Sequence, residues 1–149
     1  MITISVLNKK GGVGKSVVAL NLAYELQRKG NRLLFIDLDP QADATKILQA
    51  HFQPKKSTSP AGIYDVMIGN VKATQVIREI SKHLHFIPGI LDLIHFDLKH
   101  SSKKLADTLT NKKIKKAYDF VIIDHPPSLN EIALAGIIAS NNLIFVTEP

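Results

Sequence analysis

The sequence predicts an α/β fold: a mostly parallel sheet with helices on both faces. Three apolar runs, 1–7, 31–37 and 118–124, have the composition of buried strands rather than the alternation of half-exposed ones. A helical stretch over 17–29 lies between the first two runs, so strand, helix and strand follow one another as in a parallel βαβ unit. A glycine-rich segment and carboxylates stand where these strands end, which is where such sheets place their ligands.

The rest of the chain supplies further elements of the same kind. Strands are expected at 83–89 and 142–147, the second of them buried, and helices at 45–52, 62–69, 73–82 and 130–139. The composition of 53–61 predicts a loop. Residues 90–100 form an amphipathic segment, with Leu91, Ile94 and Leu98 on one side, and a lysine-rich helix over 101–116 is interrupted near Asn111.

Composition sets the broad class. The chain has 149 residues, 45% hydrophobic and 21% charged, which fits one globular domain over 1–149 and no second domain. No apolar run approaches the roughly 20 residues that span a bilayer, and Met1 leads directly into the first strand, so no signal peptide is expected. The absence of cysteine excludes disulfides, Cys-ligated zinc and iron–sulfur clusters. We expect a cytoplasmic protein.

The segment Asn8–Ser16 follows the first strand and opens the first helix. It reads Asn-Lys-Lys-Gly-Gly-Val-Gly-Lys-Ser. Its three glycines allow the backbone to approach an anion closely, and the free N–H groups at the helix start favour negative charge. A lysine and a serine at this point would reach the β- and γ-phosphates and a Mg²⁺ ion. The sequence therefore predicts a nucleotide site that uses Lys15 and Ser16.

Carboxylates end the second and third predicted strands. Asp37 and Asp39 lie in Asp-Leu-Asp-Pro-Gln, and Asp124 ends the run Tyr118–Asp124 before His-Pro-Pro-Ser-Leu. Carboxylates beside a triphosphate repel it unless a divalent cation is present, so their position itself indicates Mg²⁺. An acid at the end of a buried strand next to a phosphate loop is the Walker B arrangement, and Asp124 would hold Mg²⁺ together with Ser16. Capping of the following helix is the alternative role for the first two aspartates.

The loop Lys-Gly-Gly-Val-Gly-Lys-Ser resembles the deviant Walker A loop of the ParA/MinD family of P-loop ATPases, in which a lysine stands where the ordinary motif has none. The resemblance implies that Lys10 reaches the phosphates of the partner subunit in an ATP-bound homodimer. It also implies that Asp39 orients or activates the attacking water and that Asp37 lies near the metal shell. The implied catalytic residues are Lys10, Lys15 and Asp39; the implied ATP-binding residues are Lys10, Gly11, Gly12, Val13, Gly14, Lys15, Ser16 and Val17; and the implied Mg²⁺ residues are Ser16, Asp37 and Asp124.

Four positions depart from the family pattern. Ala42 and Asp43 stand where the family usually has glycine and asparagine, which puts the local loop shape and the dimer contacts in question. Val17 replaces a threonine that contacts the α-phosphate, a contact that backbone amides can also make. His125 replaces a small residue; a catalytic histidine there is the weaker interpretation.

The resemblance is closest to the ParA (Soj-like) partition ATPases and covers their N-terminal portion only. It implies a slow, dimerising Mg-ATP switch for plasmid or chromosome partition that binds DNA without sequence specificity and responds to a centromere-binding (ParB-type) adaptor, with a cytoplasmic, nucleoid-associated location and no membrane contact. The net charge of +6 is compatible with DNA binding, and seven lysines between 99 and 116 face one acid, Asp107, although a solvated helix face would look the same.

Other family members remain as alternatives. A MinD-like, membrane-associated positioning ATPase would differ at a C-terminal helix. A metal-cluster carrier would need bridging cysteines, a bacterial tyrosine kinase would need a C-terminal tyrosine cluster, and a scaffold without turnover would not need both Asp39 and Asp124. A sheet that ends on a strand at 142–147 has an open edge, so we expect a fragment or a domain that another chain completes.

Overall fold

The computed structural model describes residues 1–52, 60–97 and 102–147, which form a single six-stranded sheet flanked by helices. The strands are β1 (Ile2–Leu7), β2 (Leu33–Asp37), β3 (Arg78–Ser81), β4 (Leu84–Ile87), β5 (Phe120–Asp124) and β6 (Asn142–Phe145). Their order is β3-β4-β2-β5-β1-β6, and every neighbouring pair is parallel except β3 and β4. The predicted α/β class and parallel sheet are confirmed.

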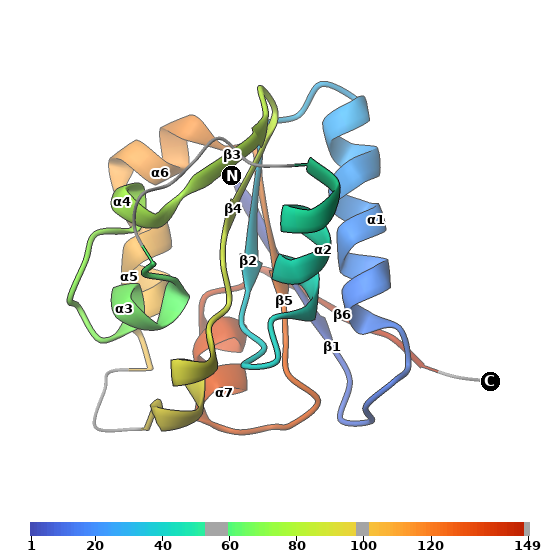
Figure 1. Ribbon diagram of the computed structural model, residues 1–149. Helices are drawn as coiled ribbons and strands as arrows, with labels where there is room; N and C mark the ends of the chain where they lie inside the picture. Colours follow the sequence, from blue (N-terminus) through green and yellow to red (C-terminus); the bar gives the residue numbers. More distant parts are fainter. Residues whose placement is uncertain (53–59, 98–101, 148–149) are drawn as a thin grey trace.

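Helices cover both faces of the sheet, as Figure 1 shows, with α1 and α2 on one side and the group from α3 to α7 on the other. The helices are α1 (Lys15–Arg28), α2 (Asp43–Phe52), α3 (Ile63–Met67), α4 (Ala73–Val76), the 3₁₀ turn η1 (Leu91–His95), α5 (Lys104–Thr110), α6 (Lys112–Ala117) and α7 (Glu131–Ile138). None of the described helices is long and apolar enough to span a membrane.

The alternation of β2 builds the two halves of the core. Leu33 and Phe35 pack beneath α1 and α2, whereas Leu34 and Ile36 pack beneath the helices of the opposite face, and all four side chains are fully buried. Successive strand residues point to opposite faces, so a strand that is apolar at every position is covered on both sides. This explains why the sequence shows a continuous apolar run there.

The helix predicted over 73–82 is only partly correct. It ends after one turn as α4, and 78–81 form β3, which pairs antiparallel with β4 through a turn at residues 82–83. Val76 and Ile80 are separated by four residues, but they pack on opposite faces of the sheet. The pairing with β4 therefore overrides the local helical pattern. His83, which the predicted strand over 83–89 includes, lies in the turn before β4.

Two further predictions need correction, and one is confirmed. β6 is not buried: it is the edge of the sheet, with Leu143 and Phe145 43% and 64% exposed. In η1 the buried residue is Leu93, while Leu91 and Ile94 face outward; Leu98 lies outside the described residues. The break near Asn111 is found, because the Asn111 side chain accepts a hydrogen bond from the Lys113 N–H and begins α6.

The central strands bring the predicted motifs to one edge of the sheet. β5 lies between β1 and β2, and the register places Asp124 beside Asp37 on one side and beside Val6 on the other. Because all three strands are parallel, their carboxyl ends meet at the same edge, where β1 leads into the phosphate loop and α1.

Candidate nucleotide-binding site

The loop between β1 and α1 has the backbone that its glycines permit. Gly12 and Gly14 have positive φ values of 77° and 84°, a conformation that costs glycine little. Gly14 is the N-cap of α1, and no side chain caps the helix. The first N–H groups of α1 are therefore left to bind an anion.

The two signature lysines of the loop occupy different environments. Lys15 is only 6% exposed, and its Nζ donates to the Lys10 carbonyl oxygen at 3.4 Å. The Lys10 backbone N–H donates to Asn8 Oδ1 at 2.8 Å, while the Lys10 side chain is on the surface. The buried position of Lys15 suits contact with a nucleotide bound in the loop. The exposed position of Lys10 suits contact with a partner subunit.

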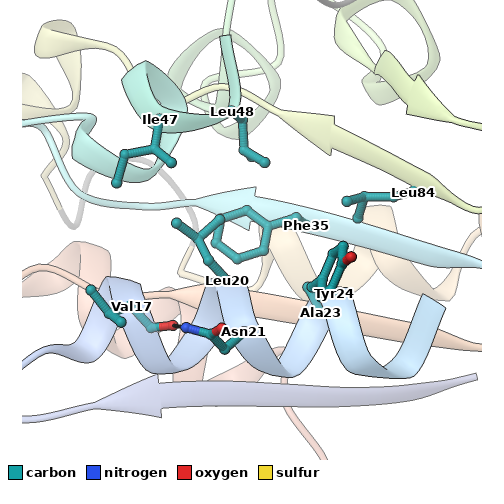
Figure 2. A pocket seen from close by; sticks show the side chains of 9 residues that line it. All are labelled: Val17, Leu20, Asn21, Ala23, Tyr24, Phe35, Ile47, Leu48 and Leu84. Carbon is teal, nitrogen blue, oxygen red and sulfur yellow. Dashed lines mark hydrogen bonds between the residues drawn. The ribbon is translucent and has the colours of Figure 1, made fainter. Parts of the chain in front are cut away.

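The side chain of Val17 lies in an apolar groove and cannot hydrogen-bond to a phosphate. It is 57% exposed and lines an apolar groove of about 280 Å³ between α1 and α2, together with Leu20, Tyr24, Ile47 and others, as Figure 2 shows. A valine side chain offers no hydrogen bond. Any contact of this residue with the α-phosphate is left to its backbone N–H.

Asp37 is fully buried, and both of its oxygens are used by the protein. Oδ1 accepts from the Asp39 N–H at 3.0 Å, and Oδ2 accepts from the N–H and the hydroxyl of Thr45 at 2.9 and 2.7 Å. Burial raises the pKa of Asp37 to about 6, and these hydrogen bonds oppose that rise. The contacts favour the capping role, because Asp37 fixes the start of α2; its place in the metal shell stays a prediction.

Asp124 differs from Asp37 in having no partners. It is fully buried, and neither carboxylate oxygen has a hydrogen-bond partner among the described residues. Burial raises its pKa to about 7; the nearby Ser16 hydroxyl lowers the pKa, Asp37 and Asp39 raise it, and Lys15 lowers it. Ser16 lies close to the carboxylate but outside hydrogen-bond geometry.

These features fit a cation. Buried polar atoms without partners are rare and call for an ion or water, and the orphaned oxygens of Asp124 lie beside the phosphate loop. In the part of the chain that the structure describes, no group of three or more His, Asp or Glu side chains is arranged to hold a metal alone. Mg²⁺ characteristically takes one or two protein ligands and completes its shell with water and phosphate. The donor set therefore suits Mg²⁺ bound with a nucleotide.

Asp39 is half-buried at the same edge of the sheet. Its Oδ1 accepts from the Gln41 N–H at 2.9 Å, and burial raises its pKa, which Lys15 lowers. The turn that follows contains Ala42 at φ 53°, the only positive φ outside glycine in the described ranges. Ala42 keeps the left-handed turn that glycine would favour, so the departure from the family pattern does not remove the turn.

The contacts of His125 favour a structural role over a catalytic one. It is 1% exposed, and its Nε2 lies 2.7 Å from Ser5 Oγ, which in turn lies 2.6 Å from Ser140 Oγ. Ser140 Oγ donates to the Gly136 carbonyl oxygen. Burial lowers the pKa of His125 to about 3, so the ring is neutral and ties the residue after Asp124 to β1 and α7.

Several residues of the site escaped sequence reasoning. Gly89 donates its N–H to Thr45 Oγ1 at 2.9 Å, and a Cβ there would lie 2.9 Å from Asp37 Cγ. A Cβ on Gly136 would lie 2.6 Å from Nε2 of His125. Among these residues only Thr45 could have been found from the sequence, because it lies in the Asp-rich motif. Gly89 and Gly136 could not, because they are required by contacts between segments that are distant in the chain.

Comparison with known proteins agrees with this site. The family model described as "AAA domain" (AAA_31) matches residues 1–149. The sporulation initiation inhibitor protein Soj of Bacillus subtilis is 29% identical over 145 residues, which cover 95% of this chain and 56% of Soj. A protein of Thermus thermophilus with the name "Probable plasmid-partitioning protein ParA" is 33% identical over 140 residues, covering 93% of this chain and 42% of that protein.

Solved structures show the same fold. The structure of a cobyrinic acid a,c-diamide synthase from Mycobacterium smegmatis with bound ADP and magnesium has a TM-score of 0.86 and 28% identity, over 98% of this chain and 59% of that chain. A plasmid partition protein from Borrelia burgdorferi bound to AMPPNP has a TM-score of 0.85 and 29% identity, over 97% of this chain and 62% of that chain.

The chain belongs to the class of P-loop ATPase domains that the AAA_31 family model describes. Within that class it is a member of the ParA/Soj-like partition ATPase family. It spans between about two fifths and about three fifths of the length of the relatives named above.

The unpartnered carboxylate predicts that Asp124→Asn stabilises the protein in the absence of nucleotide and Mg²⁺. The folded pKa of about 7 lies above the ordinary aspartate pKa of about 3.9, so the folded state binds the extra proton between these values and wild-type stability falls as pH rises from about 4 to about 7. The Asp124→Asn variant does not show this loss of stability, because its side chain does not ionise. Urea unfolding should show equal stability near pH 4 and a gain of up to about 4 kcal/mol for the variant at pH 8.

A difference between the two proteins that does not change with pH would contradict this account of Asp124. Comparison of the variant with the wild type removes the contribution of His125, which titrates in both proteins. The repulsion of Asp124 by Asp37 and Asp39 is part of the difference between the two proteins. The matched control is Asp43→Asn, because Asp43 is exposed at the start of α2.

The packing of His125 against α7 predicts coupling between two substitutions. Gly136→Ala places a methyl group against the His125 ring, and overpacking of this kind costs about 1–3 kcal/mol. His125→Ala removes the obstacle, so the double variant should lose at least about 1 kcal/mol less than the two single losses combined, measured by urea unfolding. Recovery stays partial because Leu38 Cδ1 would also lie 2.8 Å from the new methyl carbon. Additive losses would show that the ring and the helix do not contact each other in solution.

Proposed function

We propose that this protein is a Mg-ATP-dependent ATPase that dimerises with bound ATP and acts in plasmid or chromosome partition. The observation that carries the proposal is the buried Asp124 carboxylate, whose oxygens have no hydrogen-bond partner among the described residues, beside a phosphate loop with Lys15 in its interior. A site built this way is complete only with a cation and an anion. Membership of the partition ATPase family supports the same activity.

The residues of the loop bind and orient the nucleotide. The backbone N–H groups from Gly11 to Val17 surround the phosphates at the mouth of α1, and Lys15 places its ammonium against the β- and γ-phosphates. Ser16 and Asp124 would hold the metal, directly or through water. The chemistry that Mg²⁺ would supply there is neutralisation of phosphate charge.

Two residues act at the γ-phosphate. Asp39 accepts a hydrogen bond from the attacking water and orients it, and its half-buried position leaves one oxygen available, since only Oδ1 is used within the turn. Lys10 is exposed at the rim and reaches the phosphates bound to the other subunit, which makes dimerisation depend on ATP. Lys10 and Lys15 both supply positive charge to the transition state.

The loop after Asp124 reports the state of the site. A Cβ on Gly11 would lie 3.8 Å from Pro127 Cβ, so the phosphate loop and the Pro126-Pro127 segment are neighbours. Loss of the γ-phosphate changes the phosphate loop, and the contact transmits the change to the segment that leads into α7. The nucleotide thereby gates the dimer rather than driving rapid turnover.

DNA and an adaptor protein are the proposed partners. Relatives named for chromosome and plasmid partition support this, as does the net charge of +6. We propose sequence-independent binding of the ATP-bound dimer to DNA, stimulation of hydrolysis by a centromere-binding (ParB-type) adaptor, and a cytoplasmic, nucleoid-associated location.

The test is binding of the complete protein to random-sequence DNA with and without Mg-ATP. Wild type should bind only with Mg-ATP. Lys15→Ala should lose ATP binding and with it DNA binding. Asp39→Ala should keep ATP, remain a DNA-bound dimer and release little phosphate, because binding is intact and only the water is unpositioned. Size-exclusion chromatography and phosphate release are measured in the same samples.

Rapid phosphate release by Asp39→Ala would remove Asp39 from the mechanism. ATP-dependent dimerisation without any DNA binding would contradict the partition function; binding of that dimer to anionic lipid vesicles would then favour the MinD-like alternative.

A further inference from the structure

A polar groove lies on the face of the sheet opposite α1 and α2, between the α3–α4 segment and the α5–α6 pair, a side of the molecule that Figure 1 shows away from α1. Its volume is about 590 Å³. We call it the basic groove, and its lining is Val66, Gly69, Asn70, Val71, Lys72, Ala73, Thr74, Gln75, Lys104, Asp107, Thr108, Asn111, Lys113 and Ile114. It shares no residue with the nucleotide-binding site.

Three lysines from three different elements line the basic groove. Lys72 precedes α4, Lys104 begins α5, and Lys113 lies in the first turn of α6. All three are exposed, and none forms an ion pair within the described ranges. Asp107 is the single acid among the lining residues. The lining therefore carries a net charge of +2, and its hollow shape brings the cations toward a common space.

The surroundings extend the positive surface. Lys103, Lys112, Lys115 and Lys116 are exposed on or beside the same two helices. The acid that follows α6, Asp119, is held by Arg32 at 2.8 Å, and this contact keeps the pKa of Asp119 at about 2. That carboxylate is already neutralised by a cation of its own, so it does not offset the lysines of α6.

The chemistry of the lining selects the kind of anion. Lysine is a point charge with rotatable donors, and Thr74, Thr108 and Asn70 add neutral polar groups. No aromatic side chain lines the groove, so it offers no platform on which an unpaired base could stack. The exposed positions of α5 and α6 carry no large apolar side chain that could enter a bilayer. These features favour phosphates on a double-stranded backbone.

We propose that the basic groove is a docking site for the phosphodiester backbone of duplex DNA, contacted through Lys72, Lys104 and Lys113. This assignment rests on the proposed DNA-binding function and names a surface for it. Phosphate contacts of this kind position a protein on DNA without reading sequence. Because the groove and the nucleotide site share no residue, both can be occupied at once.

The salt dependence of DNA binding tests the assignment. In the complete protein with Mg-ATP, Lys72, Lys104 and Lys113 are replaced together by Gln. The control replaces Arg28, Lys29 and Lys82 by Gln, three exposed cations near the end of α1 and the β3–β4 turn, which changes the net charge equally. The slope of log K against log salt is negative, and each lost phosphate contact reduces its magnitude by about 0.9.

The groove variant should lose about 2 to 3 from that slope and bind duplex DNA at least about tenfold more weakly, while the control keeps the wild-type slope. A third variant with Arg at the three groove positions should bind like wild type. Basal ATP hydrolysis without DNA should be the same in all four proteins, which shows that the groove variant is folded.

Equal slopes in the groove and control variants, with normal DNA binding by wild type, would overturn the groove and leave the proposed function standing. Absence of DNA binding in wild type would overturn both. Loss of binding to vesicles of anionic lipid, with duplex binding unchanged, would assign the groove to a membrane and overturn the DNA assignment.

Discussion

The burial of two carboxylates side by side is the constraint on which the rest of the structure depends. The register of β2 and β5 sets Asp37 against Asp124 in the interior, where an ionised carboxylate costs several kcal/mol unless it is paired. Asp37 meets this cost with three hydrogen bonds from Asp39 and Thr45. Asp124 has no such hydrogen bonds among the described residues, and we infer that its charge is balanced by a bound cation.

The surrounding elements keep this pair in position. Gly89 lets the segment after β4 pass close to Asp37, and Gly136 lets α7 pass close to the ring of His125, the residue that follows Asp124. These contacts come from segments far apart in the chain. Contacts that fix the residues of a site in advance lower the cost of organising it at the moment of binding.

The sequence predicted the fold class because the apolar runs are a local signal. The glycine-rich loop and the acids at strand ends are local signals too, and the sheet brings these predicted site residues to one edge. The prediction failed where pairing between strands decides. Residues 78–81 have a helical pattern but join the sheet beside β4, and β6 has a buried-strand composition but lies at the edge. The apolar composition of a strand does not reveal whether a neighbouring strand or a helix covers it. The partners of His125 were likewise invisible, since Ser5 and Gly136 are distant in sequence.

The most direct measurement is the number of protons released when the protein binds Mg-ATP near pH 6.5, obtained by calorimetry in buffers of different ionisation enthalpy. With a pKa of about 7, Asp124 is mostly protonated at that pH and must ionise to face a cation. We predict a release of up to about one proton in wild type, in excess of that seen with Asp124→Asn. Equal release in the two proteins would contradict the claim that the Asp124 carboxylate receives the metal.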